Sequence, residues 1–441
     1  MVGRLNIAID DEASKLITSR ERLWEPSFKS LVLSLVTDLS YRKTAFYTNT
    51  FLFRTDEGIK DKTLDDLVTR TGKQVTDFRN ELRDQILTEN GFNPETGELE
   101  DSSKLPDCVK ASSPAHSEEE LSEFAETIAR KVEEYNNDHD VKITKPVAEI
   151  INSLEVIPED AVIVCIDEVG VKHQKEYRKP EIKEESQKKL TEEEIKLENA
   201  ETVETAIAYV RSSEGTYRIA EKTVFAALLT VLAYLLNNNL LTSRKLLFFT
   251  DGARNLKTSI EKIFAFRQFT INLDWIHVKS YCYQLLTMAL KGGKQNLERN
   301  EKIRNRFFTY LWVGDVQGAK GYLDGIDKDY VKNDSMIESV KKYLDRKSEG
   351  AEQKYFYCYQ MRKELDLINS SNQGEKSNDM IVAQRQKHNG MSWVVDGSAN
   401  LGHLKELSVN QEDDIWYRTA ILPFKPNRLT DEIVNHYHYQ A

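Results

Sequence analysis

The sequence predicts an α/β fold with a mixed sheet at its centre. Three short apolar runs, rich in β-branched and aromatic residues, have the composition of buried strands. A pair of strand-like segments with a turn at residues 213–215 follows the first run, and helical patterns follow the other two. The three runs are VIVCID, LLFFTD and TINLD, which end at Asp167, Asp251 and Asp274.

The N-terminal part, residues 27–90, reads as helical, with Leu31, Leu35 and Leu39 on one apolar face. Within it, a turn at Thr71-Gly72 would separate two helices, which is the outline of a helix-turn-helix. Two interpretations are open: a DNA-reading module and an ordinary helical hairpin.

Composition shifts divide the rest of the chain. Residues 90–120 collect Gly, Pro, Ser and acids and read as a linker, followed by a helix over 119–139. The charged segment 172–200 indicates an exposed helix or insertion, and 292–370 is helical without a strand. The predicted parts are 1–100 (helical, DNA-binding), 101–155 (linker and helix), 156–291 (first part of the core), 292–370 (all-α insertion), 371–405 (closing part of the core) and 406–441 (tail).

Composition also narrows the class of protein. The four cysteines of the 441 residues share no CxxC spacing, so neither a disulfide framework nor a cysteine zinc site is expected. The start lacks a signal-peptide pattern, and the apolar stretch from Val224 to Leu236 is shorter than the roughly twenty residues of a membrane span. We therefore expect a cytoplasmic protein. The net charge is −11, but residues 276–390 carry 20 basic and 15 acidic groups, a net +5.

Acids at the ends of apolar strands carry the chemical interpretation. Strand ends bring polar groups to a common edge of an α/β sheet, where clustered carboxylates repel unless a cation neutralises them. Oxygen ligands suit Mg²⁺ or Mn²⁺, and two such ions can promote phosphodiester cleavage. The alternative is that Asp167, Asp251 and Asp274 cap turns and the helices that follow.

These residues resemble a known family. The segments VIVCIDEVGV, LLFFTDGA and INLDWIHV look like the core of bacterial insertion-sequence DDE transposases, of the branch related to Mutator-like elements. The run from Asp274 to His277 is similar to the [C/D]xxH signature of that branch. The segment KHNGMSWVVDGSANL is similar to its closing RxGMxWSxxGAxAL block. The resemblance covers about residues 155–405.

The resemblance implies a ribonuclease-H-like core in which Asp167, Asp251 and Glu375 are the catalytic residues and hold two Mg²⁺ (or Mn²⁺) ions. Glu375 follows from the family spacing back from Trp393, and Glu364, Asp379 and Asp396 are the rival third acids. Asp274 and His277 would support the active site, or cap a helix. Lys291, Lys294, Arg304 and Arg306 are the candidate DNA contacts of the insertion, or a solvated helix face.

The activity implied is DNA cleavage and strand transfer at the ends of an insertion sequence. The partners would be the terminal inverted repeats and target DNA, with a homo-oligomer (a dimer or larger) and no membrane. The setting implied is the bacterial cytoplasm, at the nucleoid. Two alternatives stay open: a metal-dependent nuclease on the same fold and a non-catalytic DNA-binding descendant of a transposase. The altered Asn372-Gln373-Gly374 before Glu375 and the overall acidity motivate the second.

Overall fold

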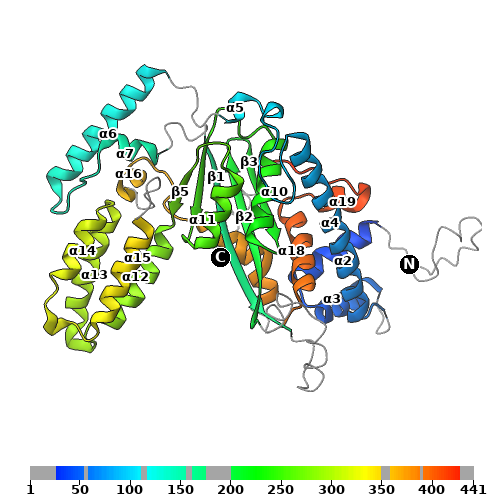
Figure 1. Cartoon of the computed structure of the whole chain (residues 1–441). Coiled ribbons are helices and arrows are strands. Elements are labelled where there is room, and N and C mark those ends of the chain that lie inside the picture. The colour runs from blue at the N-terminus through cyan, green and yellow to red at the C-terminus, as the bar shows by residue number, and fades with distance from the viewer. Residues whose placement is uncertain are drawn as a thin grey trace, which may run out of the picture.

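A five-stranded mixed sheet forms the centre of the molecule and confirms the predicted α/β class. The computed structural model describes residues 26–53, 58–110, 117–154, 161–174, 200–348, 358–387 and 391–427. The strand order is β3-β2-β1-β4-β5; β2 is antiparallel to β1 and β3, whereas β1, β4 and β5 are parallel (Figure 1). The strands are β1 (Ala161–Lys172), β2 (Thr202–Ser212), β3 (Gly215–Glu221), β4 (Lys245–Thr250) and β5 (Thr270–Leu273).

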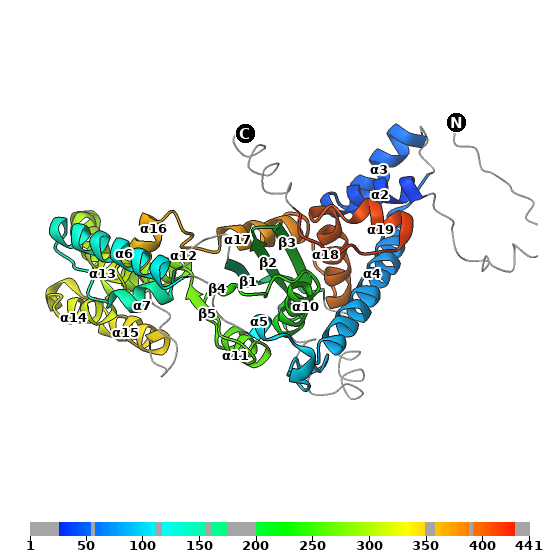
Figure 2. The same ribbon diagram turned by 90° about the horizontal axis from the view of Figure 1, so that it is seen from above.

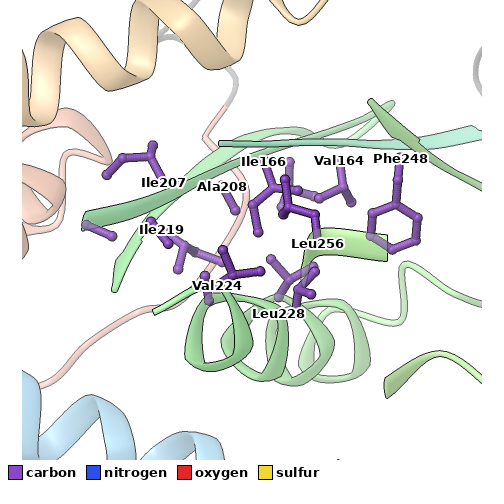
Figure 3. Close-up of a cluster of buried hydrophobic side chains, with 14 of the residues drawn as sticks. Val164, Ile166, Ile207, Ala208, Ile219, Val224, Leu228, Phe248 and Leu256 are labelled. Carbon is purple, nitrogen blue, oxygen red and sulfur yellow. The ribbon is translucent and has the colours of Figure 1, made fainter. Parts of the chain in front are cut away.

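One face of the sheet is covered by α10 (Val224–Asn237) and α11 (Arg254–Ile263). α10 is apolar on nearly all sides because it lies between the sheet and other helices, and Thr223 caps its first turn. Figure 3 shows the resulting core, where Val164 and Phe248 of the sheet face Leu228 of α10. Alternate residues of β1 therefore point into this core, and the others point to the opposite face.

The opposite face is covered by α17 (Asn372–Asn378), which begins the closing part of the core. A Cβ built on Gly374 would lie 3.0 Å from Cβ of Cys165, so the helix backbone comes very close to β1 at this glycine. After α17 the chain continues as a π-helix (Asp379–Lys387), α18 (Val395–Val409) and α19 (Asp413–Thr419). This close approach brings the polar residues of α17 to the middle of the sheet.

The expected helix-turn-helix is wrong, because residues 61–89 form one continuous helix, α4 (Asp61–Glu89). Gly72 lies inside that helix, where a Cβ would come within 2.5 Å of Cβ of Asn400 in α18. This glycine permits two helices to cross closely rather than a turn. The helices before it are α2 (Pro26–Asp38), α3 (Tyr41–Tyr47) and the π-helix Thr48–Phe53.

The expected linker over 90–120 is packed against the core where the structure describes it. Phe92, Leu105 and Val109 are buried, and Gly97 packs against Leu229 of α10 with a φ of +70°. This stretch contains the bridge between Phe92 and Leu99, a 3₁₀ turn (Ser102–Lys104) and α5 (Asp107–Lys110). The helix expected next is confirmed as α6 (Glu118–Asp138), which begins with a capping box formed by Ser117 and Glu120.

The described residues between β5 and α17 are mostly helical, which agrees with the helices expected over 292–370. α12 (Trp275–Ala289) comes before that range; within it lie a 3₁₀ turn (Lys294–Asn296), α13 (Leu297–Trp312), α14 (Val316–Asp324), a 3₁₀ turn (Lys328–Tyr330), α15 (Asp334–Ser348) and α16 (Tyr359–Glu364). α6 and α7 (Val147–Asn152) share a small core with it, in which Ile128, Ile150 and Met361 are buried. Figure 2 shows this helical part on one side of the sheet and α2–α4 on the other.

The charged segment 172–200, which was expected to be an exposed helix or insertion, lies largely outside the described residues, since 175–199 are not described. Within the described ranges, no helix is long and apolar enough to cross a membrane.

Arg79 of α4 is the main buried ionic link between the N-terminal helices and the core. Its guanidinium lies 2.8 Å from Glu221 of β3 and 2.5 Å from Glu406 of α18, with all three side chains nearly inaccessible. It also donates to the carbonyl oxygen of Ala220 at 2.8 Å. Removing one member of a buried ion pair leaves an uncompensated charge in the interior.

We therefore predict that Arg79→Ala lowers the free energy of unfolding by about 3–5 kcal/mol, because two carboxylates then stay buried without their cation. Urea denaturation measures this change. Arg70→Ala, on the exposed side of the same helix, is the matched control and should change stability by no more than about 0.5 kcal/mol. Equal effects of the two substitutions would contradict the prediction.

Candidate functional site

Three aspartates lie on neighbouring strands or directly after them, from the central β1 to the edge strand β5, and we refer to Asp167, Asp251 and Asp274 as the aspartate row. Cys165 pairs with Phe249 in the parallel register of β1 and β4, and Asp167 and Asp251 each follow two residues later. Thr250 pairs with Leu273 in the register of β4 and β5, so Asp251 is level with Asp274. Because neighbouring strands are about 4.8 Å apart, the row places three carboxyl groups close together.

The positions of the three aspartates along their strands differ from expectation in one case. β4 ends at Thr250 and β5 at Leu273, so Asp251 and Asp274 follow their strands directly, as predicted. Asp167 does not end its strand, because β1 continues to Lys172 by pairing with β2. Asp167 is therefore an interior strand residue, on the same face of β1 as Cys165 and facing α17.

Asp167 is held by hydrogen bonds from two sides. Its Oδ2 accepts from Nδ2 of Asn378 on α17 at 2.9 Å, and its Oδ1 accepts from the backbone N–H of Glu168 at 2.8 Å. Burial raises the pKa of Asp167, with Asp251 adding to the rise, whereas these hydrogen bonds and the nearby His277 oppose it. The carboxylate is thus positioned in a setting that favours a cation beside it.

Asp251 is only partly buried and begins the turn into α11. Its Oδ1 accepts from the backbone N–H of Ala253 at 2.7 Å, which is the turn-capping role that was the alternative expectation. That bond uses one oxygen, and the carboxyl group still lies within electrostatic reach of Asp167 and His277. Capping a turn and holding a cation are therefore compatible at this residue.

Asp274 is fully buried and ties three segments together. Its Oδ1 accepts from the backbone N–H groups of Ile276 at 2.6 Å and His277 at 3.1 Å, so it caps α12. Its Oδ2 accepts from the backbone N–H and, at 2.5 Å, from the Oγ of Ser371, at the start of α17. Burial alone would raise the pKa of Asp274, but hydrogen bonds from His277 and Ser371 outweigh burial and lower it. The carboxylate stays charged and structural.

His277 contacts Asp274 and interacts electrostatically with the other two aspartates. Its Nδ1 is 3.4 Å from Oδ1 of Asp274. The contact with Asp274 raises the pKa of His277 to about 9 against the effect of burial, and the charges of Asp167 and Asp251 raise it further. At neutral pH the imidazolium therefore compensates part of the negative charge of the row.

Glu375 lies on α17 between the two residues that anchor this helix, Ser371 and Asn378. The helix is fixed over β1, but Glu375 is not brought into ligand geometry with the aspartates. Among the residues that the structure describes, no three His, Cys, Asp or Glu side chains are arranged to hold a metal ion. The rival acids have other partners: Glu364 is 3.8 Å from Lys131, Asp379 accepts from Gln384 at 2.9 Å, and Asp396 is 2.6 Å from Lys222.

Two residues of the site were not found from the sequence. Ser371 and Asn378 are small polar residues in a polar helix, and their role depends on contacts with Asp274 and Asp167 that lie 97 and 211 residues away along the chain. Glu168 behaves as expected from strand alternation. It points to the opposite face from Asp167 and accepts from Asn255 of α11 at 3.2 Å.

The donor set around Asp167 and Asp251 suits a hard divalent cation. Mg²⁺ is usually bound by one or two carboxylates together with waters and substrate phosphates, rather than by a complete protein cage. Asp167 of β1 and Asp251, directly after β4, supply two such carboxylates. A group of three protein ligands is therefore not required for this ion to fit.

The four basic residues expected at DNA separate into two groups. Lys291 and Lys294 are exposed just beyond α12, and the guanidinium of Arg304 lies 4.6 Å from the ring centre of Tyr283 on α12. Arg306 instead lies 3.6 Å from Asp140 and over the ring of Tyr310. Arg306 is therefore engaged elsewhere, and the other three lie on or beside α12.

Trp275 and Trp393 belong to the core, as expected for most tryptophans. Trp275 packs against Phe308, Trp312 and Tyr359 of the insertion. Trp393 is buried, and its Nε1 donates to the carbonyl oxygen of Gln386 at 3.1 Å. The ring of Trp393 is therefore unavailable to stack on a base, whereas Trp275 is partly buried.

Comparisons with known proteins assign no family. No protein-family model matches the chain, and no curated protein matches it. Among solved structures, one entitled "Crystal structure of NurA" aligns with 14% sequence identity and a TM-score of 0.12. The alignment covers 69% of this chain and 64% of the other, so the chain spans less than two thirds of that structure. A TM-score this low supports no inference about fold or function.

We predict that the imidazole of His277 titrates with a pKa of about 9 in NMR spectra, and that Asp274→Asn moves this pKa towards the ordinary value of 6.5. The amide has the same size and keeps one accepting oxygen, which can still cap α12, but its NH2 group cannot accept from Ser371 and it loses the charge that stabilises the imidazolium. Asp396→Asn, an exposed acid paired with Lys222, is the control and should leave the titration unchanged.

The same shift predicts a pH dependence of stability. The pKa of His277 is higher in the folded chain than in the unfolded chain, so protonated His277 stabilises the folded chain. This contribution is complete below about pH 6.5 and is lost as the pH rises through about 9. Urea denaturation at pH 6 and pH 9.5 should therefore show a smaller stability difference for His277→Gln than for the wild type. An equal pH dependence in the two proteins would contradict the assignment.

Proposed function

We propose that this chain is a DDE transposase with a ribonuclease-H-like core, which cleaves DNA at the ends of an insertion sequence and transfers the strands. The observation that carries the proposal is that Asp167 and Asp251, each two residues beyond the paired Cys165 and Phe249 of β1 and β4, interact electrostatically. The sheet order, with β1 between an antiparallel β2 and a parallel β4, is compatible with that core. The sequence resemblance described above supplies the reaction class.

The chain's own residues have distinct tasks in this proposal. Asp167 and Asp251 hold the divalent cations, and Asn378 fixes the orientation of the Asp167 carboxylate. Bound Mg²⁺ or Mn²⁺ supplies Lewis acidity for the attacking hydroxyl and the leaving oxygen of a phosphodiester. Asp274 and Ser371 fix α17, which carries Glu375 as the proposed third acid, and His277 compensates charge beside the row.

Glu375 requires a local change to complete the site. The carboxylate is partly exposed on a helix of seven residues, and catalytic contacts often tighten when substrate and ions bind. The tie between Ser371 and Asp274 keeps the start of the helix fixed, so the side chain rather than the helix would move. We propose that this movement accompanies DNA binding.

Two other functions are supported by some of the same observations. A metal-dependent nuclease would use the same two aspartates, and it differs by releasing free ends without joining strands. A non-catalytic DNA-binding protein descended from a transposase is favoured by one observation, namely that the described residues form no three-ligand group. Analysis of the DNA products separates the three.

We predict that Asp167→Asn reduces Mg²⁺- or Mn²⁺-dependent cleavage of the flanking DNA by at least about a hundredfold, because one of the two carboxylates loses its charge. Binding to the same DNA, measured by gel shift, should be unchanged. Asp77→Asn, an exposed acid on α4, is the control and should cleave as the wild type does. Retained cleavage by a folded Asp167→Asn protein would overturn the proposal.

We predict that Glu375→Gln abolishes both cleavage and strand transfer while leaving DNA binding intact. The amide keeps the size of the side chain and removes the charge that a cation requires. Activity that survives in Glu375→Gln but is lost in one of Glu364→Gln, Asp379→Asn and Asp396→Asn would reassign the third acid. A wild type that binds DNA but never cleaves it would favour the non-catalytic alternative.

A further inference from the structure

One side of α12 and the turn after it form an exposed surface that begins at the aspartate row, and we call it the α12 ridge. It consists of Ile276, Lys279, Tyr283, Lys291 and Lys294, all of which are exposed. Ile276, Lys279 and Tyr283 are three and four residues apart, so they follow one side of the helix. The opposite side of α12, including Cys282 and Leu286, is buried.

The ridge is free of acids in a chain that is rich in them. From Trp275 to Leu297 the chain has no Asp or Glu, whereas the whole sequence has 72 acidic residues and a net charge of −11. The same stretch carries three lysines and His277, whose pKa is raised. The first acid beyond it, Glu298, lies 2.7 Å from Lys302. This surface therefore complements an anionic partner.

Large exposed side chains reinforce this interpretation. Tyr283 is 46% exposed, although the guanidinium of Arg304 packs over its ring. The Cζ of Arg304 lies 4.6 Å from the ring centre. This cation–π contact brings the positive charge of Arg304 from α13 to the side of α12. Ile276, which is 38% exposed, lies next to His277 at the end of the ridge nearest the aspartate row.

The geometry relates the ridge to the site. α12 begins at Asp274 of the aspartate row and leads away from the sheet into the insertion (Figures 1 and 2). Its 15 residues span about 22 Å, which equals the rise of about six base pairs of duplex DNA. A backbone that follows the helix would thus extend from Lys291 and Lys294 to the two aspartates.

We propose that the α12 ridge binds the phosphate backbone of duplex DNA immediately beside the aspartate row. Lys279, Lys291 and Arg304 contact phosphates, and Tyr283 and Ile276 pack against sugars. The proposal rests on the proposed function for the identity of the partner. It adds Lys279, Tyr283 and Ile276 to the expected contacts and removes Arg306, which is engaged with Asp140.

The test measures binding of a fluorescently labelled duplex by anisotropy, in EDTA so that no cleavage occurs, over a series of salt concentrations. Lys279→Ala and Lys291→Ala should each weaken binding by about threefold to tenfold and reduce the slope of log K against log salt by about one. Lys73→Ala, an exposed lysine on α4, is the matched control and should bind as the wild type does. Thermal melting checks that each variant is folded.

Each outcome decides the proposal. Binding by Lys279→Ala and Lys291→Ala that equals the wild type, or a wild type that does not bind the duplex, overturns it. If Tyr283→Glu separates a dimer in light scattering while DNA binding persists, the ridge contacts a second copy of the chain and the proposal is wrong. A separate assay of the same variants with Mg²⁺ measures cleavage and distinguishes the two proposals. Cleavage by lysine variants whose binding is unchanged would overturn the role of the ridge but not the proposed function, whereas ridge-dependent binding by a wild type that never cleaves would support the ridge and overturn the proposed function.

Discussion

The buried carboxylate of Asp274 is the contact on which the rest of the site depends. It has no exposed surface, and a buried charge costs several kcal/mol unless hydrogen bonds compensate for it. Asp274 receives backbone N–H donors from Ile276 and His277 and two donors from Ser371. The end of β5, the first turn of α12 and the start of α17 therefore meet at one side chain.

That constraint explains how a distant segment comes to complete the centre of the sheet. α17 follows the helices that come after β5, yet Ser371, the residue before it, donates to Asp274, and its last residue, Asn378, donates to Asp167. The two ends of this helix are thus held by residues of the sheet region that lie far away along the chain. The negative charge gathered at the aspartate row is compensated in part by His277, whose own orientation also depends on Asp274. A divalent cation between Asp167 and Asp251 would supply the rest.

Local patterns predicted the parts of this structure that depend on local sequence. The strands, the positions of Asp251 and Asp274 and the capping of α12 follow from apolar runs and the residues directly after them. The predictions that were wrong concern residues whose structure depends on contacts with residues far away in the sequence. Asp167 lies inside β1 because β2 extends the pairing, and Gly72 lies inside α4 because Asn400 approaches it closely. The composition of residues 90–110 indicated a linker but could not show that Phe92 and Leu105 are buried in the core. Ser371 and Asn378 carry no local signal at all, since their partners are remote in sequence.

The central claim is that Asp167 and Asp251 together hold a divalent cation. The most direct test is a Mn²⁺ titration followed by electron paramagnetic resonance, comparing the wild type with Asp251→Asn in the presence of duplex DNA. We expect the wild type to bind Mn²⁺ and Asp251→Asn to bind it at least about tenfold more weakly, because one of two carboxylate ligands is lost. Equal binding by the two proteins, or no binding by the wild type, would show that these two aspartates do not form the cation site.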